Sequence, residues 1–309
     1  MLTRADRPWT NVYGVARSTL AAATLLTLLA NRADELFHPL VTDDPGIFDR
    51  RGIDGLSLFF LAHEHLTLAK ISAVLILVLV LVGWRPRLMA LPHWWVSYSL
   101  AASAAVIDGG DLVAATLTLL LVPVCLTDRR VWHWQGIGEG GVPASVAAQT
   151  SLLLVRFQVS VIYLFAAVLK LPSEQWSNGT ALYYWWTHPK FGPWGPVRWV
   201  TDLLGATVLV VPITWGVLGL ELCLAFALLA PGRFRERLLP VGLLLHAGIA
   251  VVHGMPTFAL TMSAALVLYL RPWWRPFEFP EFVRRPAVRR ERPVEDVSYA
   301  PRAPAPGPR

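Results

Sequence analysis

The sequence contains few charged residues and few cysteines for its length. Only 16% of its 309 residues are charged, two are cysteine and three are lysine. Soluble domains usually carry about 25% charged residues, so this scarcity argues against a soluble globular protein. Cys125 and Cys223 both lie within apolar runs, and they provide neither a CxxC metal motif nor a disulfide framework. The N-terminus has no convincing signal cleavage site, so we interpret the first apolar run, which contains Arg17, as a membrane span.

Apolar and aromatic residues are abundant instead. Hydrophobic residues make up 55% of the chain and 14 residues are tryptophan, a composition typical of membrane proteins with aromatic belts at both lipid boundaries. The bias toward arginine, alanine and proline suggests a bacterial source, so we expect a multi-pass protein of the bacterial plasma membrane. The net charge is +6, and the basic residues lie in short loops and a basic tail. This distribution favours lipid headgroups over nucleic acid as the partner of the basic residues.

The apolar runs predict an all-α bundle with about eight transmembrane spans, because each run approaches the roughly 20 residues that cross the bilayer. We expect one transmembrane domain over residues 1–275 and a disordered Pro- and Arg-rich cytoplasmic tail over 276–309. The fourth span contains Pro123 and has the least certain boundaries. The predicted spans are 12–31, 64–83, 88–107, 111–127, 146–170, 203–230, 237–253 and 256–271.

Arginine residues recur in every second connection between these spans. By the positive-inside rule those connections are cytoplasmic, which places both ends of the chain inside. The alternate connections face outward, and two of them are longer than simple turns. Residues 32–63 are expected to lie on the membrane surface. Residues 171–202, rich in Trp and Tyr, are expected to form an interfacial lid or an aromatic anchor. The cytoplasmic arginines are Arg4, Arg7, Arg85, Arg87, Arg129, Arg130, Arg233, Arg235, Arg237, Arg271 and Arg275.

The fifth span carries a polar stripe at helical spacing. Lipid cannot satisfy such a stripe, so we expect it to face other helices or a cavity. From their depth, we predict that Arg156 pairs with Glu221 and that His246 lies nearby in one buried layer. This layer could equally be a structural ion pair that fixes helix register. The stripe contains Gln149, Arg156, Ser160, Tyr163 and Lys170.

A second group of polar residues lies at the outer ends of the spans. These groups are predicted to ring an outward-facing cavity: Lys170, His253, Asp108 and Asp111, with His63, Glu64, His65 and Lys70 at the start of the second span. Lysine can lose its proton when desolvated and then serve as a base, which arginine essentially cannot. Lys170 is therefore our candidate catalytic base, although it could instead be an anchor whose ammonium reaches the headgroups. No metal site is expected, because neighbouring His63 and His65 point in different directions on a helix.

Several motifs resemble those of the HTTM domain, which also forms the membrane part of vitamin K-dependent γ-carboxylase. The resemblance covers approximately residues 10 to 272 and is closer still to the SdpB-like branch. The matching stretches are Tyr13-Gly14-Val15-Ala16-Arg17, Asp108-Gly109-Gly110-Asp111, Leu126-Thr127-Asp128-Arg129-Arg130, His133-Trp134, residues 156–171, Trp176 and residues 178–184.

The resemblance implies specific roles. Lys170-Leu171 matches the Lys-Leu of the carboxylase, whose lysine deprotonates vitamin K hydroquinone, and His246 matches a histidine of the family's late helices. This chain has Asp108-Gly109-Gly110-Asp111 where the carboxylase has an Asn-His pair, and it ends in a short tail rather than a lumenal domain. Members of the SdpB-like branch act with a partner protein to mature an exported antimicrobial peptide.

Three functions therefore remain open. The first is a membrane component that matures an exported peptide together with a soluble partner. The second is a carboxylase-like enzyme in which Lys170 takes a proton from a quinol, the only cofactor that we consider. The third is a small-molecule transporter, which would also use paired intramembrane charges. Transporters often contain repeated halves with broken helices, and the sequence shows no such symmetry.

Overall fold

The computed structural model describes residues 7–37 and 53–278, and every regular element in that part is helical. The prediction of an all-helical chain is therefore confirmed. The predicted tail from residue 279 onward lies outside the described residues. The α-helices are α1 (Asn11–Ala30), α2 (Ala33–Leu36), α4 (Leu58–Leu61), α5 (Leu66–Leu81), α6 (Ala90–Ser103), α7 (Gly109–Thr127), α8 (Val142–Val168), α9 (Glu174–Ser177), α10 (Ala181–Thr187), α11 (Gly195–Gly205), α12 (Val210–Phe226), α13 (Gly232–His253) and α14 (Pro256–Leu270), with 3₁₀ turns η2 (Ile53–Leu56), η3 (His63–His65) and η4 (Ala227–Leu229).

Each of the eight predicted spans coincides with a helix, but the helices differ in length. Six of them are long and apolar enough to cross a membrane, namely α1, α5 with η3, α7, α8, α12 with η4, and α13. Helix α14 is a shorter apolar helix of 15 residues, and α6 has 14 residues. Both are shorter than the roughly 20 residues that span the hydrocarbon.

Local capping explains where several helices begin and end. Asp108 and Asp111 form a reciprocal capping box at the start of α7, in which each side chain accepts a hydrogen bond from the other residue's backbone N–H. This arrangement satisfies two of the amides that a helix N-terminus leaves unpaired. At the C-terminal end of α13, Gly254 adopts φ of 65°, a left-handed conformation that glycine adopts without strain. The turn into α14 follows directly.

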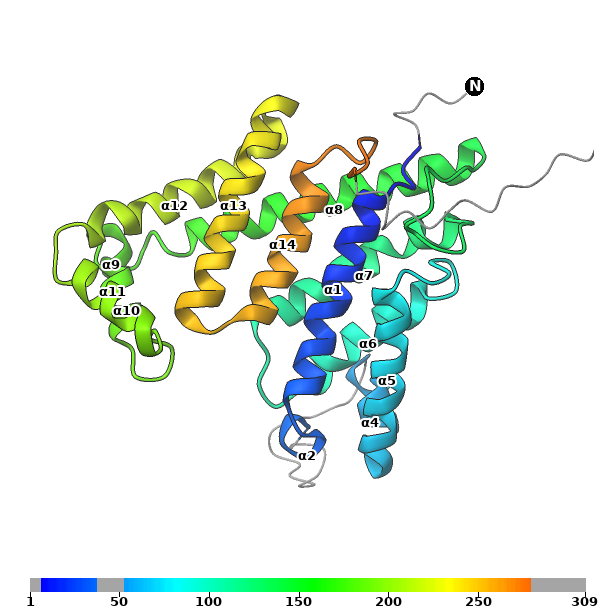
Figure 1. The fold of residues 1–309 in the computed structure, drawn as a ribbon, viewed down its shortest axis with the longest axis horizontal. Helices are drawn as coiled ribbons and strands as arrows, with labels where there is room; N and C mark the ends of the chain where they lie inside the picture. The colour runs from blue at the N-terminus through cyan, green and yellow to red at the C-terminus, as the bar shows by residue number, and fades with distance from the viewer. Residues whose placement is uncertain (1–6, 38–52, 279–309) are drawn as a thin grey trace, which may run out of the picture.

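The first and last helices pack side by side and close the bundle. Helix α1 contacts α14, α5 and α7, while α14 also contacts α13, α7 and α8. Figure 1 shows α8 running across the molecule, from the side of the N-terminus toward the group formed by α9, α10 and α11. Two apolar cores result, one centred on α1, α7, α8 and α14 and the other on α1, α5 and α6.

Helix α8 separates its apolar and polar side chains by face. Phe157 and Phe165 are more than half exposed, whereas Arg156 and Tyr163 are buried. Large apolar groups on an outer face indicate contact with lipid. The polar stripe therefore faces other helices, as predicted from its spacing.

Candidate functional site

Two hydrogen-bonded pairs connect the polar stripe of α8 to the helices that follow it. The first pair joins Tyr163 on α8 to His246 on α13, with 2.7 Å between the Tyr163 Oη and His246 Nε2 atoms. Both residues are buried, and the ring of Phe258 lies edge-on to the imidazole. The Nδ1 atom of His246 has no hydrogen-bond partner among the described residues. This imidazole therefore retains one unused donor or acceptor position.

The second pair is an ion pair between Lys170, just beyond the end of α8, and Glu221 on α12. The Lys170 ammonium donates to both carboxylate oxygens, with 2.6 Å to Oε2. It also lies 4.9 Å from the centre of the Trp176 ring, in cation–π geometry. The Lys170 side chain is 25% exposed and that of Glu221 is 11% exposed. The pair is thus largely shielded, with its lysine end open to the surroundings.

The two pairs form one cluster, which we call the α8 site: Tyr163, Lys170, Glu221 and His246. Tyr163 lies on α8 and Lys170 follows two residues after its end, about two helical turns away, so the two pairs are neighbours along this helix. The helices that carry them are held together nearby. Ser160 on α8 donates to the Ala225 carbonyl of α12, and Tyr269 on α14 donates to the adjacent Leu224 carbonyl.

The predicted pairing of Arg156 with Glu221 is wrong. The Arg156 guanidinium instead donates to the carbonyl oxygens of Leu268, at 3.4 Å, and Arg271, at 2.9 Å. It also stacks 4.3 Å from the centre of the Trp273 ring. Glu221 pairs with Lys170, which the sequence analysis had assigned to a separate outer group. The error arose because depth along a helix does not reveal how far a lysine side chain reaches.

The predicted outer ring stays a prediction, and Asp108, Asp111 and His253 have local partners in the structure. Asp108 and Asp111 cap α7, and Thr257 lies 3.5 Å from Asp108. The imidazole of His253 lies 2.9 Å from the Phe191 carbonyl oxygen. Within the described part of the chain, no hydrogen bond or ion pair joins these three groups to Lys170. Each has a local structural partner, so a shared catalytic role for them stays a prediction.

The aromatic segment predicted at residues 171–202 folds as short helices beside the α8 site. Helix α10 contacts α12, and α11 contacts α10 and α13. Trp194 donates to the Val251 carbonyl near the end of α13, while Trp199 remains 72% exposed. The segment is therefore tied to the bundle and also presents large rings outward, which accommodates both the lid and the anchor interpretation.

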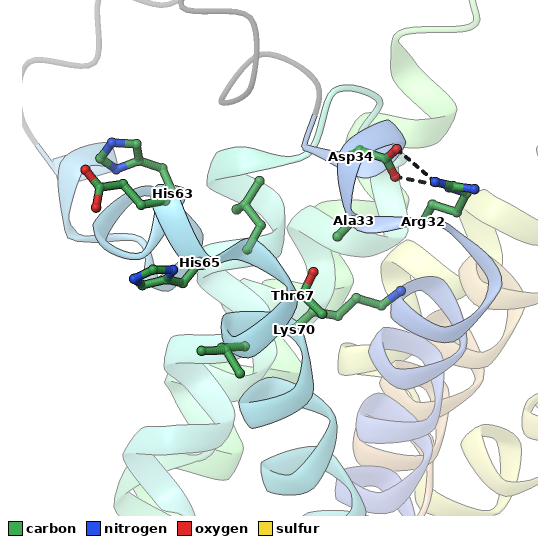
Figure 2. Close-up of a pocket in the computed structure, with 10 residues that line it drawn as sticks. Arg32, Ala33, Asp34, His63, His65, Thr67 and Lys70 are labelled. Atoms are coloured by element: carbon green, nitrogen blue, oxygen red, sulfur yellow. Dashed lines mark hydrogen bonds and ion pairs between the residues drawn. The ribbon is translucent and has the colours of Figure 1, made fainter.

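A separate open hollow lies far along the chain from this site, between α2 and the start of α5. Its volume is about 740 Å³. Figure 2 shows Arg32 and Asp34 joined on one side and His63 and His65 on the other. The hydrogen bond from Arg32 lowers the pKa of Asp34. The charged residues that line this hollow all lie outside the α8 site. Its size alone does not make it the candidate functional site.

Sequence reasoning missed a third polar region, around the connection between α7 and α8. Tyr13 donates to Asp128, and Arg130 donates to the same carboxylate with 2.8 Å between Nη2 and Oδ2. The His133 imidazole lies 3.3 Å from the Ser18 hydroxyl. Burial lowers the pKa of His133 well below its ordinary value, and the charge of Arg17 lowers it further. Arg17 in an apolar run and the family motifs at residues 13–17 and 126–134 were the available signals, but the sequence did not show that these segments meet.

These features define the class of protein: an α-helical membrane protein with buried ionisable pairs between its helices. Comparison with curated proteins gives its family. The chain is 38% identical to the uncharacterized protein YitO of Bacillus subtilis (strain 168) over 292 residues, which cover 92% of this chain and 93% of YitO. It is 36% identical over 272 residues to the sporulation-delaying protein SdpB of the same strain, covering 86% of this chain and 82% of SdpB. The chain belongs to the SdpB family. No family model matches the sequence, and no solved structure matches it.

Proposed function

We propose that this protein is a membrane component that matures or modifies an exported antimicrobial peptide, with the α8 site facing the peptide. Membership in the family of SdpB, a sporulation-delaying protein, supports a role in such a peptide system. The observation that carries the proposal is the Lys170–Glu221 pair beside Trp176, at the open end of an otherwise buried polar stripe. Ionisable groups inside the bilayer are costly and usually functional.

The proposal includes a topology. It adopts eight spans in the bacterial plasma membrane with both chain ends in the cytoplasm, as the arginine distribution indicates. Lys170 then lies at the outer surface, where an exported peptide is accessible. A soluble partner protein would meet the peptide on that side, beside the aromatic segment of α9–α11.

The chemical role that we propose for the α8 site is proton transfer. Lys170 and Glu221 can exchange a proton directly because the ammonium donates to both carboxylate oxygens. Tyr163 and His246 provide a second hydrogen-bonded pair about two helical turns away along α8. Lys170 must give up its proton before it can act as a base, so Glu221 is the natural first acceptor.

A carboxylase-like enzyme is the second candidate, and the retained Lys170-Leu171 sequence at the end of α8 favours it. In this version the chain carries the HTTM-type membrane fold, and a quinol donates its proton at Lys170. Modification of the peptide then depends on the quinolate that this proton transfer leaves. This version predicts that peptide modification requires a quinone pool, whereas presentation of the peptide to a soluble partner does not.

The test is the intact mass of the exported peptide from cells that produce wild-type protein or Lys170→Ala. We expect the peptide from the variant to lack a mass increment or a cleavage that the wild type introduces. Lys190→Ala is a matched control, because it removes the same charge from the exposed part of the aromatic segment. Membrane abundance must be equal for all three proteins. Identical mature peptide from all of them would contradict a chemical role for Lys170.

A further inference from the structure

Arg17 is an arginine with no charge partner in the interior of the bundle. Its side chain is completely buried, and none of its three guanidinium nitrogens has a hydrogen-bond partner among the described residues. No described carboxylate forms an ion pair with it. The other buried arginine of the spans, Arg156, has two backbone carbonyls and a tryptophan ring. Arg17 is thus the exception, and it lies about one and a half turns into α1.

Further buried polar atoms without partners lie on the elements around Arg17. They are His93 Nε2 and Ser97 Oγ on α6 and His133 Nδ1 on the connection between α7 and α8. His93 and Ser97 are four residues apart and therefore share one face of α6. Both imidazoles come from elements that pack on α1, because α6 contacts α1 and the His133 Nε2 atom lies 3.3 Å from the hydroxyl of Ser18, the residue after Arg17. All three residues are at most 3% exposed.

The positions of these residues are fixed by close packing. The His133 ring lies so close to α1 that a Cβ atom added to Gly14 would come within 3.1 Å of it. The His133 amide donates to the Gly83 carbonyl, and a Cβ atom on Gly83 would lie only 2.4 Å from the ring. The neighbouring carboxylate of Asp128 is already engaged by Tyr13 and Arg130. It is therefore not free to compensate Arg17.

An uncompensated buried charge costs several kcal/mol, and neutral water molecules supply hydrogen bonds but no opposite charge. We propose that Arg17, His93 and Ser97 form a binding site for a small monovalent anion, with the His133 ring packed beside it. The guanidinium supplies the charge, and the Ser97 hydroxyl and the His93 Nε2–H supply further donors. The His133 ring donates its own N–H to Ser18, whose hydroxyl donates to the Leu81 carbonyl, so it borders the site without donating to the anion. The anion is small because Arg17, His93 and Ser97 are all buried.

The site is distinct from the α8 site, which lies on α8, α12 and α13. It brings together two sequence motifs that the proposed function does not use, Tyr13–Arg17 and Asp128–His133. An anion there would join α1 to α6, and the α7–α8 connection packs on α1 through the His133 ring. We infer that it stabilises this end of the bundle and that its loss loosens that connection.

The test measures thermal unfolding of the purified full-length protein in detergent, followed by tryptophan fluorescence, with chloride as the probe. Sodium chloride replaces sodium gluconate at constant ionic strength. We expect the wild-type midpoint to rise by several degrees and to saturate. Arg17→Gln should abolish the saturable response. Arg32→Gln, which removes the same charge from an exposed ion pair, should retain it.

Ser97→Ala provides a second variant if Arg17→Gln does not fold. Loss of one donor should raise the chloride concentration at half-response about five- to tenfold. A chloride response that is unchanged in Ser97→Ala, or that persists in Arg17→Gln, would place the anion elsewhere and overturn the proposal. No saturable response of the wild type to chloride, nitrate or hydrogencarbonate would also overturn it, since the site would then hold water alone.

Discussion

Removing the charge of Lys170 while leaving Glu221 should destabilise the protein more than removing both charges. In Lys170→Met the carboxylate of Glu221, only 11% exposed, loses the ammonium that donates to both of its oxygens. In the double variant Lys170→Met/Glu221→Leu no charge remains, and the two new side chains have comparable volume. A buried ion pair replaced by apolar residues is often neutral or stabilising.

The magnitude follows from burial. Breaking a fully buried pair by removing one partner costs about 3–5 kcal/mol. The Lys170 side chain is 25% exposed, and partial exposure screens the charges, so we expect about 2–3 kcal/mol for Lys170→Met. For domains of 150 to 250 residues 1 kcal/mol shifts the melting temperature by about 2–4 °C, which gives a fall of about 4–12 °C. Glu221→Leu should cost less, because the freed lysine can reach the headgroups.

The assay is thermal unfolding of the four proteins in the same detergent and at the same heating rate. We expect the double variant within about 2 °C of the wild type, with Lys170→Met clearly lower. A Lys170→Met variant as stable as the wild type would show that Glu221 is well solvated. Additive losses in the double variant would show that the two residues do not interact, and either result would refute the pairing.

Two further predictions concern other hydrogen-bonded groups. Tyr163→Phe removes the hydroxyl that lies 2.7 Å from His246 Nε2. Thermal or denaturant unfolding should show a loss of about 1–3 kcal/mol in the free energy of unfolding, and no change would argue against that hydrogen bond. Stability should also fall as the pH drops below about 6.5, the ordinary pKa of histidine in an unfolded chain. Burial lowers the pKa of His133 in the folded protein, so below this pH the unfolded chain binds a proton that the folded chain does not. Melting temperatures from pH 8 to pH 5 in gluconate test this, and His133→Gln should flatten the profile; an equally steep profile in that variant would assign the effect to another group.

The sequence predicted the helices well because a long apolar run in a bilayer must satisfy its own backbone hydrogen bonds, which it does as an α-helix. All eight runs became helices, and α7 begins at Gly109, two residues before the predicted start at 111, because Asp108 caps it. Helix length was predicted less well at residues 88–107. The helix α6 that forms there ends at Ser103, and Ala104 adopts extended backbone. Apolar content alone does not determine where such a helix stops.

Partners across the bundle were harder to predict than helices. Spacing identified the stripe on α8 because positions seven residues apart share a face, but it gave no information on which helix packs against it. Lys170 was assigned to an outer group and Glu221 to an inner one, yet they pair. The Arg17 group was overlooked because its members come from α1, α6 and a connecting loop. Only the packing of those elements brings Arg17, His93 and His133 together.

The measurement that tests the central claim most directly is the intact mass of the exported peptide from cells producing the double variant Lys170→Met/Glu221→Leu. This variant is expected to fold as well as the wild type while lacking both charges of the α8 site. Our account predicts that the peptide lacks the change that the wild type introduces. Mature peptide of unchanged mass, at equal membrane abundance, would contradict a chemical role for the site and leave the ion pair as a structural contact.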